Sequence, residues 1–177
     1  MGKVTSYEYG RAVFVYNMHI RDSISRFKYH GRREYAQFYA DSMFELYGGW
    51  INSISPDALI PVPIHKKRYN KRGYNQSKLI ADILGEKCGV PVLSDYIERC
   101  IDTRPQKELT PVERKQNVDG AFIVTEGAKE LYKDVQCVII IDDIYTTGST
   151  IEACARVLKE NDVSVIYFLC VSIGMGL

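Results

Sequence analysis

Two largely apolar runs constrain the fold of this chain more than any other feature. Residues 135–141 read VQCVIII, and residues 163–171 read VSVIYFLCV. Neither run alternates with polar residues, so each predicts a strand that is buried on both faces. The residues between them, 149–161, have the pattern of an amphipathic helix that opens with Ser149 and Glu152 at capping-box spacing. This order predicts parallel strands with a helix packed on the sheet.

The rest of the chain continues the alternation of strands and helices. Helices are predicted at 22–29, 32–47 and 75–89, and strands at 7–16, 57–63, 90–94, 96–101 and 120–124. The first strand could be a hairpin that turns at Gly10, and Gly48-Gly49 is predicted to end the second helix. We therefore expect an α/β fold, in which a mostly parallel sheet carries helices on both faces.

Composition excludes several classes of protein. The 177 residues suffice for one domain, and the net charge of +1 gives no global field that would favour nucleic acid or an anionic membrane. The five cysteines are odd in number and form no C-x-x-C pair, which favours buried thiols in a reducing compartment over a zinc site. The first residues do not resemble a signal peptide, and the apolar runs are too short to span a bilayer. We expect a cytoplasmic protein.

Chemically unusual residues follow the strand at 135–141. The segment VIIIDDIYTTGST, from Val138 to Thr150, places two aspartates and then a Thr-Gly-Ser loop between a strand and a helix. Free N–H groups and partial positive charge at a helix start suit a phosphate monoester. Carboxylates suit the hydroxyl groups of a vicinal diol, and they can also hold the water shell of a magnesium ion. The pattern predicts a site for a ribose 5-phosphate, whereas a simple turn followed by a capped helix is the structural alternative.

The same segment resembles the signature of type I phosphoribosyltransferases, which bind 5-phosphoribosyl-1-pyrophosphate (PRPP). The resemblance implies that Asp142 and Asp143 take the ribose hydroxyls. It also implies that the 5-phosphate binds to Thr146, Thr147, Gly148, Ser149 and Thr150. Neither a Walker phosphate loop nor a G-x-G-x-x-G motif is present in the sequence.

A basic stretch, PVPIHKKRYNKRGYNQS at 61–77, could neutralise the pyrophosphate of PRPP. Its candidate pyrophosphate-binding residues are His65, Lys66, Arg68, Arg72 and Gly73. A solvated basic loop is one alternative. Another is a contact with single-stranded DNA, because Tyr69 and Tyr74 interleave with the charges.

This stretch is also similar to the ComF/GntX family, whose R-G-[FY]-N-Q block is matched by residues 72–76. Residues 99–122 are similar to a long loop of that family, and the resemblance runs from about residue 14 to 172. Many ComF-like proteins begin with a cysteine-rich zinc segment, which residues 1–177 lack through either truncation or loss, so no metal ligand is carried over. The resemblance implies an N-terminal hood at 1–50 and a phosphoribosyltransferase core at 51–177, within one compact domain.

The long charged segment at 100–119 is the third candidate region. In type I phosphoribosyltransferases the matching loop closes over PRPP and excludes water. Arg104, Gln106 and Arg114 are the candidate ligand contacts here, and a solvated loop is the alternative.

The sequence therefore predicts Mg²⁺-dependent transfer of a phosphoribosyl group from PRPP to an unknown acceptor, a small molecule expected to be a nucleobase. The family resemblance implies a role linked to competence and DNA uptake or utilisation. The alternative is a non-catalytic module that senses PRPP or nucleotides, or assists DNA uptake through protein or single-stranded DNA partners. An oligomer is compatible with either prediction.

Overall fold

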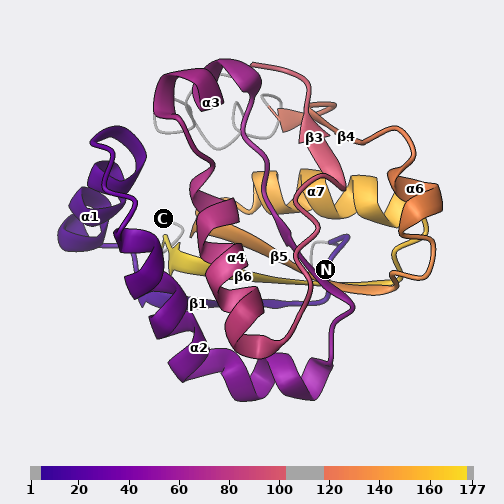
Figure 1. Ribbon diagram of the computed structural model, residues 1–177, viewed down its shortest axis with the longest axis horizontal. Coiled ribbons are helices and arrows are strands. Elements are labelled where there is room, and N and C mark those ends of the chain that lie inside the picture. The colour runs from indigo at the N-terminus through magenta and orange to yellow at the C-terminus, as the bar shows by residue number, and fades with distance from the viewer. Residues whose placement is uncertain (1–4, 103–117, 175–177) are drawn as a thin grey trace.

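The computed structural model describes residues 5–102 and 118–174, and its centre is a four-stranded sheet (Figure 1). All neighbouring strands of this sheet are parallel, in the order β1-β6-β5-β2. The strands are β1 (Gly10–Val15), β6 (Val165–Ile173), β5 (Cys137–Tyr145) and β2 (Ala58–Pro61). The predicted α/β class with a mostly parallel sheet is confirmed.

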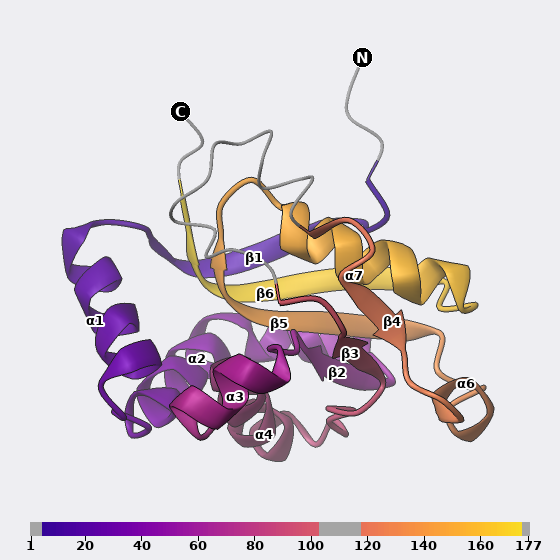
Figure 2. The same ribbon diagram turned by 90° about the horizontal axis from the view of Figure 1, so that it is seen from above.

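Helices cover both faces of the sheet. Figure 2 shows α7 (Ser149–Glu160) on one face, with α2 (Tyr35–Ile54) and α4 (Gln76–Cys88) on the other. The remaining elements are α1 (Met18–Tyr29), α3 (Lys66–Arg72), α6 (Ala128–Leu131) and an antiparallel pair formed by β3 (Ile97–Arg99) and β4 (Phe122–Val124). Among the described residues, no helix is long and apolar enough to cross a membrane.

Strand β5 shows why its apolar run is uninterrupted. Val138 and Ile140 belong to the core cluster that includes α7, whereas Ile139 and Ile141 belong to the cluster formed with α1, α2 and α4. All four side chains are fully buried. Because successive side chains of a strand point to opposite faces, a strand between two helical layers needs apolar residues at every position.

Helix α2 is longer than predicted. It continues through Gly48 and Gly49 and ends at Ser55, which has a left-handed backbone with φ of 51°. Ile51, beyond the glycines, is fully buried against the sheet. Each glycine costs a helix about 1 kcal/mol, and burial of the following turn outweighs that cost.

Gly10 does not turn a hairpin, because β1 runs straight and parallel to β6. A Cβ atom at Gly10 would lie 2.4 Å from the ring of Phe168, so the glycine permits close packing of that ring on the strand. β1 lies within residues 1–50 and is an edge strand of the central sheet. The division between hood and core at residue 50 stays a prediction.

Candidate functional site

The two aspartates lie inside the carboxyl-terminal part of β5, which extends to Tyr145 rather than ending before them. Asp142 is 6% exposed and Asp143 is 3% exposed. The side chain of Asp142 accepts a hydrogen bond from Ser77 Oγ at 3.1 Å and another from the backbone N–H of Asp143 at 2.9 Å. The Asp142 side chain, a predicted ligand contact, is therefore buried and already hydrogen-bonded within the protein.

Asp143 is held by residues from other elements. Its Oδ2 lies 2.5 Å from Lys28 Nζ, in the last turn of α1, and it accepts a long hydrogen bond of 3.5 Å from Gln76 Nε2 at the start of α4. Lys28 is not among the site residues predicted from the sequence, because a single lysine far away in the chain belongs to no motif. No local signal in the sequence could have found it.

The aspartate pair has unusual electrostatics. Burial and the neighbouring charge of Asp143 raise the pKa of Asp142 to about 7, although Lys28 and the two hydrogen bonds act in the opposite direction. Burial in an apolar interior disfavours the charged form of an acid, and two adjacent acids repel each other. A pair that gains or loses a proton near neutrality is typical of a functional site.

The R-G-Y-N-Q block ties this acid pair to the N-terminal helices. Arg72 donates to Gln76 Oε1, and its guanidinium lies over the Tyr29 ring at 5.5 Å. Tyr74 donates from its hydroxyl to the carbonyl of Phe27 in α1. These contacts place the block between α1 and the aspartates.

The remaining residues of the block fix the backbone around α4. The carbonyl of Gly73 accepts from Arg33 at 3.0 Å, and Gly73 itself ends α3 with a left-handed φ of 79°. Asn75 caps α4 through its side-chain oxygen and donates to the carbonyl of Val62 at 3.0 Å. Tyr74 is only 4% exposed, so it is not available as a stacking surface for a DNA base.

The basic stretch forms the short helix α3 rather than a loop, with His65 as its N-cap. The side chains of this stretch converge on Asp102: Lys67 Nζ lies at 3.6 Å, Arg68 Nε at 3.9 Å, and the ring nitrogen Nδ1 of His65, which accepts from the Lys67 N–H, at 3.8 Å. Lys66 is exposed to solvent. Two of the candidate pyrophosphate residues, His65 and Arg68, are thus brought together, whereas Arg72 contacts α1 and Gly73 contacts the connection between α1 and α2.

The loop at 146–150, named the phosphate loop after the ligand that the sequence predicts for it, contains a glycine with a left-handed backbone. Gly148 has a φ of 76°, and a Cβ atom there would lie 2.5 Å from the Tyr145 hydroxyl. The hydroxyls of Thr147 and Ser149 lie 2.8 Å apart. A small hollow is lined by Ile144, Tyr145, Thr146, Gly148, Ser149, Thr150 and Ile151. The first turn of α7 lines this hollow, and the start of a helix carries partial positive charge.

The predicted capping box at the start of α7 is wrong. Gly148 is the N-cap and makes no side-chain cap, and Glu152 bonds to a distant segment instead. Its carboxylate accepts from the backbone N–H of Ser6 at 3.0 Å and from Ser6 Oγ at 2.7 Å. Next to it, the Tyr7 and Tyr145 hydroxyls are 2.8 Å apart. Residues 6 and 7 therefore brace the phosphate loop.

Other regions add less to the site. Arg104, Gln106 and Arg114 lie outside the described residues. Arg99 in β3 lies with its guanidinium 5.3 Å from the centre of the Phe122 ring, and burial lowers its pKa. Within the described residues, no group of three or more His, Cys, Asp or Glu side chains could hold a metal ion.

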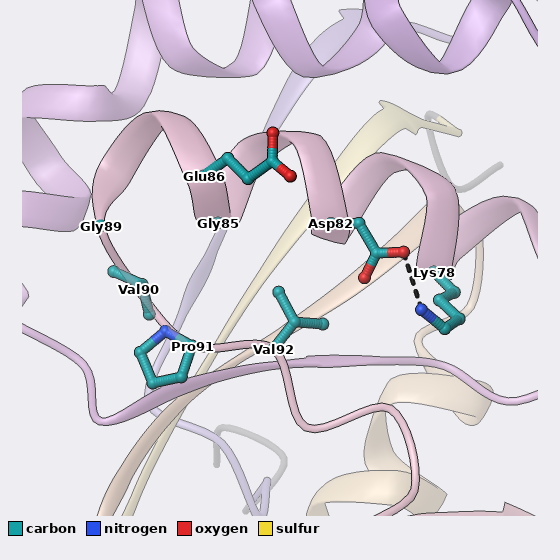
Figure 3. A pocket seen from close by; sticks show the side chains of 8 residues that line it. All are labelled: Lys78, Asp82, Gly85, Glu86, Gly89, Val90, Pro91 and Val92. Atoms are coloured by element: carbon teal, nitrogen blue, oxygen red, sulfur yellow. Dashed lines mark hydrogen bonds and ion pairs between the residues drawn. The ribbon is translucent and has the colours of Figure 1, made fainter.

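A separate groove runs along the outer side of α4 (Figure 3). It is lined by Lys78, Asp82, Gly85, Glu86, Gly89, Val90, Pro91 and Val92. Lys78 and Asp82 already pair with each other at 2.7 Å, and no predicted site residue lines the groove. Those predicted site residues that the structure describes therefore lie outside this groove.

Comparison with known proteins agrees with the resemblance in the sequence. The chain is 33% identical to competence protein F of Haemophilus influenzae over 111 residues, and this match covers 63% of this chain and 48% of that protein. It is 32% identical over 115 residues to the DNA utilization protein YhgH of Salmonella typhi, covering 65% and 48%. It is 28% identical over 153 residues to competence protein ComFC of Bacillus subtilis, covering 85% and 58%. No family model matches the chain.

Among solved structures, a purine phosphoribosyltransferase from Pyrococcus horikoshii OT3 is similar over 77% of this chain and 73% of its own, with a TM-score of 0.41 and 17% identity. These sequence relatives are named as competence and DNA-utilization proteins, which confirms that the chain is similar to ComF-type proteins. The chain spans about half the length of the curated relatives that it matches.

Proposed function

We propose that the chain binds PRPP together with Mg²⁺ and transfers its phosphoribosyl group to a nitrogenous base, with release of pyrophosphate. One observation carries the proposal: a buried pair of aspartates, Asp142 and Asp143, stands on the same strand end as a glycine loop that opens α7. A ribose 5-phosphate carries a diol, which suits the two acids, and a phosphate, which suits the loop. In parallel α/β sheets, ligands bind beyond the carboxyl ends of the strands, where both features lie.

Each part of PRPP has a proposed place. The 5-phosphate binds to the loop at 146–150, and the ribose hydroxyls donate to Asp142 and Asp143. The pyrophosphate binds to the cations of α3, of which Arg68 lies beside Asp102, together with the neighbouring His65 ring. Carboxylate oxygens suit a magnesium ion, which would share the ligand with Asp142 and Asp143 through water molecules.

The proposed reaction needs little covalent chemistry from the protein. The bond between ribose C1 and the pyrophosphate oxygen breaks, the electron pair leaves with pyrophosphate, and a base nitrogen forms the new bond to C1 before it loses its proton. Positive charge develops on the sugar, while negative charge develops on the leaving group. The residues act by positioning the two reactants and by neutralising charge on pyrophosphate.

Titration calorimetry with PRPP and Mg²⁺ tests the proposal. The unaltered chain should bind, and the double variant Asp142→Asn/Asp143→Asn should lose at least about 100-fold in affinity, because each lost charged acceptor costs several kcal/mol. Asp82→Asn is the control for the substitution: it removes one carboxylate charge from a partner of Lys78 outside the site and should bind normally. Equal binding by all three proteins, or by none, would contradict the proposal.

A second assay separates an enzyme from a sensor. Release of pyrophosphate is measured while nucleobases are offered one at a time to the chain loaded with PRPP. Release that depends on a base supports transfer. Tight PRPP binding without release by any base supports the non-catalytic alternative, in which the site reports PRPP to a partner in competence or DNA utilisation.

A further inference from the structure

Lys28 stands out because it reaches the acid pair from a helix that no site motif includes. Its ammonium group lies 2.5 Å from Asp143 Oδ2, and the two side chains are 20% and 5% exposed. This is not a surface ion pair, since both charges have lost much of their water. Removing one partner of such a pair leaves an uncompensated charge in the interior, so the contact is expensive to break.

The rest of α1 holds this lysine in place. Ile24 and Phe27 are buried in the core cluster on this face of the sheet. Ser23 bonds to the Tyr39 hydroxyl of α2 at 2.5 Å, and Tyr74 donates to the carbonyl of Phe27 directly before Lys28. The position of Lys28 is therefore set by the packing of α1 and not by Asp143 alone.

The charged and titratable groups around Asp143 show which cation balances its negative charge. The charged and titratable groups that face Asp143 are Asp142 on β5, Lys28 on α1, Tyr39 on α2, Arg72 on α3 and Cys170 on β6. The amide of Gln76 on α4 also donates to it. Of these groups, Lys28 is the cation in direct contact with Asp143. Its charge also lowers the pKa of Asp142, against the effects of burial and of Asp143.

Ionisation decides what a carboxyl group can do for a sugar. An ionised carboxylate only accepts hydrogen bonds, whereas a protonated acid also donates one and accepts less. A diol that donates two hydroxyl protons therefore needs ionised acceptors. Without a neighbouring cation, two adjacent buried acids tend to retain a proton.

We propose that Lys28 is a positioning residue of the ribose site, which supplies the positive charge that keeps the aspartate pair able to accept hydrogen bonds from a vicinal diol. The inference rests on the proposed function and extends it to α1, because the docking of this helix becomes a condition for ligand binding. The class of ligand that it selects is a sugar phosphate with a free diol.

The test measures binding of ribose 5-phosphate by titration calorimetry between about pH 6 and pH 8.5, a range around the pKa of Asp142, which is about 7. Lys28→Met should weaken binding at pH 7 about 10-fold and move the acid limb of the binding profile to higher pH. Lys28→Arg, which keeps the charge, should stay within about threefold. In the Asp143→Asn background, Lys28→Met should cause little further loss, because the two residues act as one unit.

Lys78→Met is the matched control, since Lys78 forms a 2.7 Å pair with Asp82 outside the site and its loss should leave the pH profile unchanged. If Lys28→Met does not fold, as judged by circular dichroism, Lys28→Gln keeps a donor without the charge and takes its place. Unchanged or tighter binding by the uncharged variant, with an unmoved pH profile, would overturn the inference alone. A chain that binds neither ribose 5-phosphate nor PRPP would overturn the proposed function as well.

Discussion

The two ends of the candidate site are built in opposite ways. At the acid end, contacts of 2.5–3.5 Å connect Asp142 and Asp143 with Ser77, Lys28 and Gln76 in the interior. At the basic end, the ion pairs to Asp102 are 3.6–3.9 Å long, and the Lys67 side chain is 77% exposed. Water and salt screen the second set and hardly reach the first. The acid end is preorganised, whereas the basic end can adjust to its ligand.

Gly148→Ala should damage the preorganised end most. The change adds a Cβ atom 2.5 Å from the Tyr145 hydroxyl at a φ of 76°. We expect destabilisation of about 2–3 kcal/mol in urea unfolding and no detectable binding of ribose 5-phosphate.

The control for this change is Gly89→Ala. Gly89 also has a left-handed backbone, with a φ of 67°, but nothing lies within 4 Å of its added Cβ atom. It should cost about 1 kcal/mol and leave binding intact. Equal losses from both variants would show that backbone strain, and not the contact with Tyr145, makes Gly148 necessary.

Asp142→Asn should stabilise the chain while it removes ligand binding. Burial raises the pKa of Asp142 from 3.8 in the unfolded chain to about 7 in the fold. The folded state therefore holds this proton more tightly, and the stability that Asp142 contributes falls as pH rises from about 4 to about 7. The amide has no charge to desolvate, so the gain in free energy of unfolding should grow over that range and reach on the order of 2–4 kcal/mol above it.

Chemical denaturation at several pH values measures this gain. Asp57→Asn is a useful comparison, because Asp57 accepts backbone N–H bonds from Gln136 and Cys137 at the other end of β5. That variant should lose stability, since the amide is a weaker acceptor. A gain in the free energy of unfolding for Asp142→Asn that does not change with pH would contradict the raised pKa of Asp142.

Tyr74→Phe tests the link between the acid end and α1 with a smaller effect. The variant leaves the buried carbonyl of Phe27 without the hydroxyl that donates to it. We expect a loss of about 1–2 kcal/mol in stability. Tyr69→Phe, at an exposed position of α3, should change stability very little by the same measurement.

Lys67→Ala should have the smallest effect and mark the adaptable end. Its exposed pair with Asp102 is 3.6 Å long, so stability should change by less than about 0.5 kcal/mol. PRPP affinity should fall about two- to threefold at low salt, and the difference should vanish near 1 M salt. A large loss of PRPP affinity that does not depend on salt would show that the basic end is preorganised as well.

The features that could be predicted from the sequence are those formed by residues close together in the chain. The β5–α7 unit could be found because Val138 to Thr150 carry the strand, the acids and the loop in one stretch. Lys28 and the bond from Ser6 to Glu152 could not, because both join residues far apart in the chain. The prediction that α2 ends at Gly48-Gly49 was wrong for the same reason. Glycines are typical of helix ends, but burial of Ile51 against strands distant in the sequence stabilises a further turn of the helix.

The bracing of α7 by Ser6 offers a way to observe the site directly. The Ser6 bonds to Glu152 and the hydroxyl pair of Tyr7 and Tyr145 bring the start of the described chain beside Gly148. A fluorophore attached at Thr5 would sit next to the phosphate loop without replacing any of its residues. Its emission would serve as an optical reporter of occupancy, usable to screen ligands before any chemistry is known.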